Sequence, residues 1–329
     1  MIRLLATLQV ILLLTGIAHA RSEDGTLGIL RVPNNGQPAI VMHGESFTIR
    51  AQGRPDIFVD MAGQLLELTA NWHSIKNGLD EASVALPTDF APGLHTIVGI
   101  LGDTEDVQPR ALLVLDDEPI RYHVAHIPSP GIQAAQEASL AGTGGLITVV
   151  TGNLTANGTA DEFRTLLDWL NTSPNATIIA PGRRDSVDNR FGDYFDTAPH
   201  TTWCGRDAYI TIGETFPQAG DDVTGEAAAY EQIRRATKPA RWSIGISGYA
   251  YDALSLRMQI VLFVDIPLHA FVSGRARPNA GENPTASWDS FQGPTRILAP
   301  SAERAPGIQW IHVTRAGVAV GGPPTEDEQ

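Results

Sequence analysis

Residues 145–170 read GLITVVTGNLTANGTADEFRTLLDWL and join a short apolar run to a helix through a polar loop. The apolar run up to Val150 predicts a buried strand. Thr159 and Glu162 have the spacing of a capping box. The apolar positions that follow fall at i, i+3, i+4 and i+7, which is one face of a helix: Phe163, Leu166, Leu167 and Leu170. The stretch therefore predicts strand, loop and helix in that order, which is typical of an α/β domain.

The loop itself lies between Gly152 and Gly158. Loops at the carboxyl ends of strands are where α/β proteins hold ligands. This loop offers Asn153, Thr155 and Asn157 but no carboxylate. It has the glycine turns of a metal-binding loop without an anionic ligand.

Similar segments continue on both sides and predict an α/β domain over residues 118–320. Strands are expected at 121–127, 145–150, 176–180, 242–247, 270–274, 295–299 and 308–314, and helices at 131–141, 159–170, 225–236 and 254–262. The end of the chain, GGPPTEDEQ at 321–329, is expected to be a disordered tail.

Residues 21–117 have a different pattern, in which short β-rich runs alternate with turns. SFTIRAQ, LHTIVGIL and RALLVLD read as strands, and NNGQP, HGES, KNG and APG read as turns. We expect an all-β sandwich of immunoglobulin-like type here. This part holds no cluster of catalytic residue types, which favours a spacer or docking role.

Residues 1–20 have the features of a secretory signal peptide. Arg3 precedes a leucine-rich core, and Ala18, His19 and Ala20 form a small-x-small cleavage site, so the mature chain would begin near Arg21. The alternative is an uncleaved membrane anchor, but the apolar run is short for a span. The sequence thus predicts an exported protein, periplasmic or extracellular, with no membrane span after cleavage.

Charge and cysteine content narrow the function classes further. A formal net charge of −14 argues against nucleic acid or anionic lipid as a partner. Cys204 is the only cysteine, so neither an internal disulfide nor a cysteine zinc site can form. We expect Cys204 to be packed in the core, and a catalytic thiol is the alternative.

The loops that follow the expected strands, taken in order, carry a family resemblance. They are VAHIPSP, VVTGNLTANG, APGRRD, IGISGYA and FVSGRARP. This ordered set, over roughly residues 122–278, resembles the calcineurin-like metallophosphoesterases. The resemblance implies a four-layered α/β/β/α sandwich that binds two metal ions at these loops. The scaffold positions agree with the family pattern: Gly152, Gly158, Gly182, Asp185 and Gly274.

The metal-ligand positions that the resemblance implies are all substituted in this chain. They are His126, Pro128, Asn153, Arg183, Arg184, Ser247 or Gly248, Arg275 and Arg277. Two divalent cations at roughly 3.5 Å repel each other by about 20 kcal/mol at an effective dielectric constant near 20. Asparagine and proline supply no charge against this repulsion, and arginine adds to it. We therefore expect no metal cofactor and no catalytic residue at the expected positions.

Two other sites are weaker alternatives. His126 could join Asp185 and His269 in a single-metal site. His123 and His126 lie three apart on a strand and point to opposite faces, so one metal cannot easily take both. No nucleophile elbow of the Gly-x-Ser-x-Gly type and no phosphate loop occurs.

Three functional hypotheses remain. The first is a catalytically inactive phosphoesterase fold, whose arginines 183, 184, 275 and 277 either grip a phosphate, sulfate or carboxylate or are merely solvated or paired with Asp185 and Asp265. The second is an active phosphoesterase with an atypical, mononuclear metal site. The third is an envelope or cell-surface module that binds through the β-sandwich. The sequence names no partner.

Overall fold

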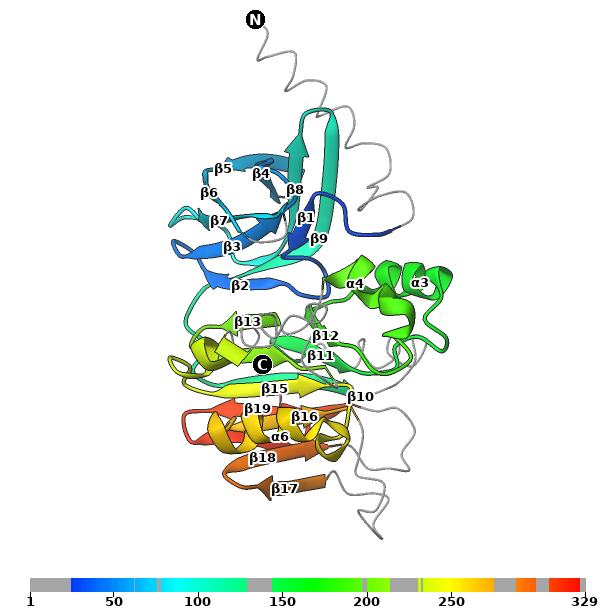
Figure 1. Ribbon diagram of the computed structural model, residues 1–329. Helices are drawn as coiled ribbons and strands as arrows, with labels where there is room; N and C mark the ends of the chain where they lie inside the picture. The colour runs from blue at the N-terminus through cyan, green and yellow to red at the C-terminus, as the bar shows by residue number, and fades with distance from the viewer. Residues whose placement is uncertain are drawn as a thin grey trace, which may run out of the picture.

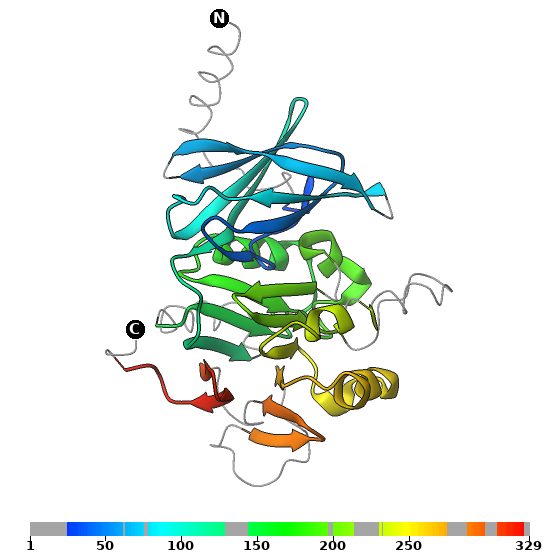
Figure 2. The same cartoon turned by 90° about the vertical axis from the view of Figure 1, so that its left-hand side faces the viewer.

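The computed structural model describes residues 25–325 apart from 62, 76–77, 129–143, 197–199, 214–229, 232, 275–287 and 300–307. Its first part, coloured blue to cyan, is stacked on one end of a larger part, coloured green to red (Figures 1 and 2). Both parts are rich in β-structure, and described helices occur only in the second part.

Two sheets form the first part. One has the order β1-β3-β7-β6, with bounds Leu30–Val32, Ser46–Ala51, Asp80–Ala85 and Ala70–Ser74. The other has the order β2-β9-β8-β4-β5, with bounds Ala39–Met42, Thr104–Leu115, Gly93–Leu101, Asp56–Met61 and Gln64–Leu68. Apolar side chains of both sheets, among them Ile49, Val84, Ile57 and Ile97, share one buried cluster. Burial alternates along β3 because successive side chains of a strand point to opposite faces.

Two mixed sheets form the second part. The first has the order β12-β11-β10-β19-β20, with bounds Ala176–Ala180, Ile147–Thr151, Tyr122–Pro128, Gln309–Thr314 and Gly317–Gly321. The second has the order β13-β14-β15-β16-β18-β17, with bounds His200–Cys204, Asp207–Thr211, Ser243–Ser247, Ala270–Ser273, Thr295–Ala299 and Trp288–Gln292. Strands β10 to β12 are parallel, as are β14, β15, β16 and β18, so their carboxyl ends lie at a common edge of each sheet.

The second part packs as helix, sheet, sheet and helix. A central cluster joins the inner faces of the two sheets, for example through Val124, Ile178 and Ile246. The outer face of the first sheet packs on α3 (Ala160–Leu170) and α4 (Arg190–Phe195). The outer face of the second sheet packs on α6 (Leu256–Ile260) and the π-helical turn Val261–Asp265. Apolar burial on both faces explains the fully buried patterns of β11, β12 and β15.

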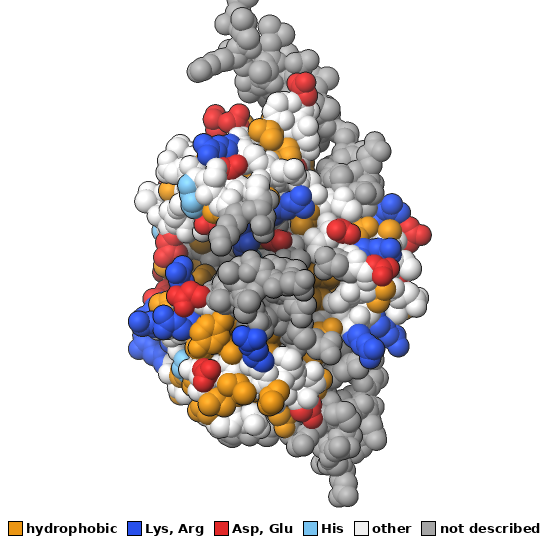
Figure 3. All heavy atoms as spheres, viewed as in Figure 1, with side chains coloured by type: hydrophobic (Ala, Val, Ile, Leu, Met, Phe, Trp, Pro, Cys, Tyr) orange, Lys and Arg blue, Asp and Glu red, His pale blue; other side chains and the backbone are white. Residues whose placement is uncertain are grey.

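Helix α3 forms as its sequence predicts. The Thr159 side chain accepts a hydrogen bond from the Glu162 backbone, and the Glu162 side chain accepts one from the Thr159 backbone, which completes the capping box. Phe163, Leu166 and Leu170 are buried against the first sheet. By contrast, the helix α6 side of the molecule exposes Leu256 and Val264, and Figure 3 shows hydrophobic side chains gathered where α6 lies in Figure 1.

The NNGQP segment is more than a surface turn. Asn34, Asn35 and Gln37 are buried, and the amide of Ile179 in β12 donates a hydrogen bond to the carbonyl oxygen of Gly36 (2.9 Å). The Asn35 side chain also donates to Asn171 after α3 (2.7 Å). The segment therefore docks the first part onto the second, which its turn pattern did not predict.

Several sequence expectations can be compared with these elements. The strands expected at 176–180, 270–274 and 308–314 are confirmed within one residue at each end. Strands β13, β14, β17 and β20 and helix α4 were not predicted. The expected segments at 1–20 and 131–141 lie outside the described residues, and the helix expected at 225–236 is described only from residue 230. No described helix combines the length and the apolar character that a membrane crossing requires.

Candidate functional site

The strand-end loops that carry the family resemblance come together at one edge of the two stacked sheets. The loops after β11 and β12 belong to the first sheet, and the loop after β15 belongs to the second. Gly152, Gly182 and Gly248 are the residues at which these loops meet, and all three are buried. The spacing of the expected loops is thus compatible with one shared site.

The three loops meet by direct backbone contact. A Cβ atom at Gly248 would lie 2.4 Å from the carbonyl oxygen of Pro181 and 2.6 Å from the Cα atom of Gly152. A Cβ atom at Gly182 would lie 2.4 Å from the backbone nitrogen of Asn153. Only glycine permits such an approach. The main chain therefore fills the space between the two sheets where these loops cross.

The loop after β16 packs into the same place. A Cβ atom at Gly274 would lie 2.8 Å from both the carbonyl oxygen and the hydroxyl oxygen of Thr151. The Gly274 amide donates to the backbone carbonyl oxygen of Ser247 (2.7 Å). The Ser273 hydroxyl donates to the backbone carbonyl oxygen of Tyr249 (3.0 Å). These contacts join the carboxyl ends of β15 and β16 to that of β11.

His126 lies beside this contact, at the carboxyl end of β10, and is fully buried. Its Nδ1 is 2.7 Å from Oε1 of Gln309, and its Nε2 is 2.8 Å from the Thr151 hydroxyl. Because a carboxamide oxygen only accepts, Nδ1 donates and Nε2 accepts from Thr151. Burial lowers the pKa of His126 to about 4, although the hydrogen bond with Gln309 raises it, so the ring is neutral at pH 7.

Asp185, one of the scaffold positions of the family resemblance, braces the loops. Its buried carboxylate accepts hydrogen bonds from the backbone nitrogens of Leu154 (3.1 Å), Thr155 (2.7 Å) and Gly182 (2.8 Å). It also accepts one from the Thr155 hydroxyl (2.8 Å). Four donors on one carboxylate satisfy its negative charge within the protein. Within the described part of the chain, no ion pair joins Asp185 to Arg183 or Arg184, and both arginines are exposed.

Apart from the buried Gly158, the remaining site positions of the first sheet lie at the surface or are half-buried. Asn153 has a positive φ of 44°, and its side-chain oxygen accepts a hydrogen bond from the Arg184 backbone (3.3 Å). Arg183 and Arg184 are exposed, and Pro128 is half-buried at the end of β10. Gly158 has a φ of 69°, and a Cβ atom there would lie 2.7 Å from the carbonyl oxygen of Arg184.

The remaining positions of the second sheet are Ser247, Arg275 and Arg277. The Ser247 side chain accepts a hydrogen bond from the Tyr249 backbone (3.2 Å). Arg275 and Arg277 lie outside the described residues. His269 is at the amino end of β16 in the second sheet, where its Nδ1 is 2.9 Å from the Ser243 hydroxyl, whereas His126 is near the carboxyl end of β10 in the first sheet. The single-metal grouping of His126, Asp185 and His269 is therefore wrong.

These residues do not fit a dinuclear metal centre. Neither nitrogen of His126 has a free lone pair, and the Asp185 carboxylate is turned toward backbone amides. Within the described part of the chain, no three His, Cys, Asp or Glu side chains are grouped as metal ligands. A pair of divalent cations needs a bridging carboxylate and further anionic or imidazole ligands, which these positions do not offer.

Sequence reasoning missed the two residues that hydrogen-bond to the buried His126 ring. Thr151 and Gln309 hold His126, and they come from β11 and β19, which lie on either side of β10 in the sheet. A polar residue in an otherwise apolar strand pattern was the only signal of Thr151. Gln309 gave no usable signal, because its partner lies 183 residues away.

A second buried polar cluster lies at the amino ends of the strands. Asp207 binds Arg241 through a bidentate ion pair and accepts a hydrogen bond from the Tyr122 hydroxyl (3.0 Å). Burial raises the pKa of the neighbouring Cys204 to about 12, so its thiol is protonated and not a nucleophile at neutral pH. The expectation of a packed cysteine is confirmed.

Comparisons with known proteins give only distant similarity. No protein-family model and no curated protein matches the chain. A purple acid phosphatase from seeds of yellow lupin (Lupinus luteus) is 10% identical, with a TM-score of 0.43 over 88% of this chain and 66% of that chain. The immunoglobulin domains of a titin–obscurin-like 1 complex are 19% identical, with a TM-score of 0.17 over 24% of this chain and 87% of that chain. A tandem of titin immunoglobulin domains is 16% identical, with a TM-score of 0.17 over 27% of this chain and 46% of that chain. Likeness at this level assigns neither a family nor an activity.

Proposed function

We propose that this is an exported binding protein with a calcineurin-like phosphoesterase fold that has lost its metal centre. In this proposal residues 118–320 form the phosphoesterase-like domain, and residues 21–117 form an immunoglobulin-like sandwich. The helix, sheet, sheet and helix packing and the order of the strand-end loops support the fold. The signal-like residues 1–20 support export.

The closed packing of the strand-end loops is the observation that carries the proposal. Gly152, Gly182 and Gly248 bring three loop backbones into contact at the edge where the family resemblance implies metal ions. A neutral imidazole at His126 occupies the first expected ligand position. Both features stabilise the fold without metal, and neither supplies the charge that would offset two divalent cations.

Metal content and phosphoesterase activity test this proposal directly. The full mature chain would be expressed in medium supplemented with manganese, iron and zinc, then dialysed and analysed by mass spectrometry. We expect substoichiometric metal and no turnover of phosphomonoester or phosphodiester substrates. At least one metal ion per chain, together with turnover that a chelator abolishes, would establish the active mononuclear hydrolase instead.

The exposed arginines give a second candidate function, in which the former metal loops bind an anion. Arg183 and Arg184 extend from a loop whose backbone is held rigidly by Asp185. Guanidinium groups bind phosphate, sulfate and carboxylate oxygens well when they are pre-positioned. Arg275 and Arg277 would have to reach the same place from the loop after β16.

Calorimetry with phosphate and sulfate esters tests the anion site. If the site exists, we expect saturable heat that salt reduces and that the double variant Arg184→Ala with Arg275→Ala abolishes. Arg164→Ala is the control, because Arg164 is an exposed arginine on α3 that pairs with Asp161 (2.7 Å). Absence of heat in the wild-type protein would show that the arginines are only solvated.

A further inference from the structure

The chain contains three asparagines that are followed directly by glycine. In such a pair the backbone nitrogen of the glycine can attack the asparagine side chain, because glycine has no Cβ atom to hinder the approach. Asparagine is for this reason a chemically labile residue. The three pairs are Asn35 with Gly36, Asn77 with Gly78, of which Asn77 lies outside the described residues, and Asn157 with Gly158.

The fold holds both reacting groups of the pair Asn35 and Gly36. Asn35 is 2% exposed, and its side-chain amide donates a hydrogen bond to Asn171 (2.7 Å). The Gly36 amide donates to the side-chain oxygen of Asn34 (3.0 Å). The carboxamide and the backbone nitrogen cannot approach each other without breaking a buried hydrogen bond, which costs free energy. We therefore expect this pair to be inert in the folded protein.

Both reacting groups of the pair Asn157 and Gly158 are free. Asn157 is exposed, and within the described part of the chain its side chain makes no hydrogen bond. The Glu162 carboxylate accepts hydrogen bonds from the neighbouring backbone amides, those of Ala156 (3.0 Å), Asn157 (3.1 Å) and Thr159 (2.9 Å). It passes over Gly158, whose amide donates to no group among the described residues. The one backbone nitrogen that the reaction needs is thus the one that Glu162 does not hold.

The contacts that hold Gly158 in place do not involve its nitrogen. Gly158 is buried, and a Cβ atom there would lie 2.7 Å from the carbonyl oxygen of Arg184. The carbonyl oxygen of Gly158 accepts a hydrogen bond from Arg190 (2.8 Å). The Cα atom and the carbonyl group are therefore fixed, while the exposed side chain of Asn157 can change rotamer and reach the amide.

We propose that Asn157 is a site of spontaneous deamidation. The Gly158 nitrogen, after losing its proton to a base in solution, attacks Cγ of Asn157. The new N–Cγ bond forms as the Cγ–Nδ2 bond breaks, and Nδ2 takes up protons from solvent and leaves as ammonia. Water then opens the cyclic succinimide, at Cγ to give aspartate or at the main-chain carbonyl to give isoaspartate. One carboxamide and one water molecule thus become one carboxylate and ammonia, without an oxidant or a cofactor.

The product changes the charge and the length of this loop. The loop between Gly152 and Gly158 has no carboxylate in the sequence, and the reaction places one there. The new charge lies on the residue whose amide contacts the Glu162 carboxylate, so the two charges repel. Isoaspartate also adds a carbon atom to the main chain between the amides of Asn157 and Thr159, which both donate to Glu162. We expect the modification to weaken the capping box at the start of α3.

Peptide mass spectrometry of the full mature chain, incubated in mildly alkaline buffer, tests the site. Deamidation at Asn157 should accumulate at least about ten-fold faster than at Asn35, because Asn35 reacts only after the fold opens locally. In urea the two asparagines should react at similar rates, which separates the effect of the fold from that of the sequence. The site does not depend on the proposed loss of the metal centre, because the reaction uses only the chain and water.

Asn157→Gln is the matched control, since it keeps an exposed carboxamide but moves it one methylene away from the Gly158 nitrogen. It should remove the modification at this position. The melting temperature of the wild-type protein should fall on incubation, and that of Asn157→Gln should stay unchanged.

Hydrogen exchange of the Gly158 amide gives an independent measurement, because exchange and deamidation both begin with loss of the same proton. We expect the Gly158 amide to exchange much faster than the Gly36 amide, which is hydrogen-bonded. The proposal is overturned if Asn157 reacts no faster than Asn35 in the folded protein, or if the Gly158 amide is protected from exchange.

Discussion

At the scale of single residues, the His126 ring is held in the core as a neutral group by two hydrogen bonds. The ring lies fully buried between Gln309 and Thr151, and both of its nitrogens are satisfied. Protonation would place a second donor against the Thr151 hydroxyl and an unpaired charge in the core. The folded protein therefore binds a proton at His126 far less readily than the unfolded chain does.

This difference predicts a pH dependence of stability. The pKa of His126 falls from an ordinary value of 6.5 to about 4 in the folded state. The stability from the neutral ring is thus fully present above pH 6.5 and is lost as the pH falls toward 4, by roughly 3 kcal/mol in total. Urea unfolding at a series of pH values measures the slope. His126→Gln, which cannot titrate, should reduce that slope by about one proton, and equal slopes in the two proteins would contradict the assignment.

At the level of elements, glycines decide how closely the strand-end loops approach. Gly248 follows β15 and is in backbone contact with the loops after β11 and β12. The loops belong to two different sheets, so this contact fixes the distance between the sheets at their carboxyl edge. A side chain at this position would have to push main chain aside, because no flexible side-chain end is available to move.

Gly248→Ala is therefore expected to destabilise the protein by about 2–3 kcal/mol, the range of an overpacked core. The free energy of unfolding in urea measures the effect. Gly322→Ala is the control, because a Cβ atom at Gly322 would have no neighbour within 4 Å and should change stability by less than about 0.5 kcal/mol. A loss of similar size in both variants would contradict the role of close contact at Gly248, because the loss of glycine's backbone freedom by itself stabilises the folded state.

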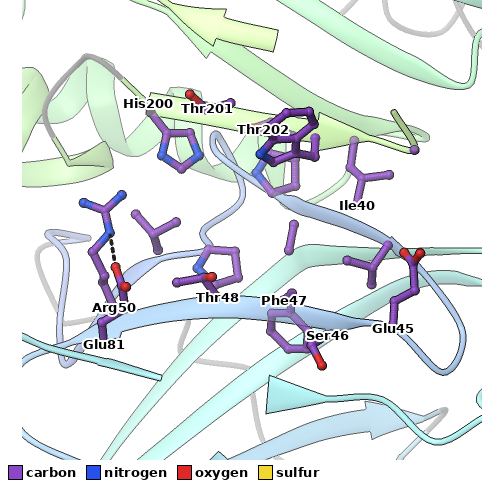
Figure 4. A pocket seen from close by; sticks show the side chains of 17 residues that line it. Ile40, Glu45, Ser46, Phe47, Thr48, Arg50, Glu81, His200, Thr201 and Thr202 are labelled. Atoms are coloured by element: carbon purple, nitrogen blue, oxygen red, sulfur yellow. Dashed lines mark ion pairs between the residues drawn. The ribbon is translucent and has the colours of Figure 1, made fainter. Parts of the chain in front are cut away.

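At the level of the whole molecule, the two parts are joined by buried contacts and not only by the chain that connects them. Ile40, Leu113 and Leu115 of the sandwich belong to the same apolar cluster as the inner faces of the two mixed sheets. The NNGQP segment adds buried hydrogen bonds to β12 and to the residue after α3. A cavity of about 350 Å³ lies between the two parts, with β3 on one side and β13 on the other (Figure 4).

The sequence by itself determined the local elements and showed which side-chain types occupy the strand-end loops. Periodicity and capping located α3, and apolar runs located β11, β12 and β15, because hydrophobic spacing and cap hydrogen bonds act over a few residues. The scaffold position of Asp185 came from the family resemblance, and the hydrogen bonds that it makes came only from the structure.

Only the tertiary structure decided which distant groups meet. The pairing of His126 with Gln309, the contact of Gly248 with Gly152, and the cavity between β3 and β13 all join residues that the chain separates widely. Such contacts depend on strand order and domain docking, which no short stretch of sequence encodes. For the same reason, edge strand β13 and the buried NNGQP segment were not recognised as parts of an interface.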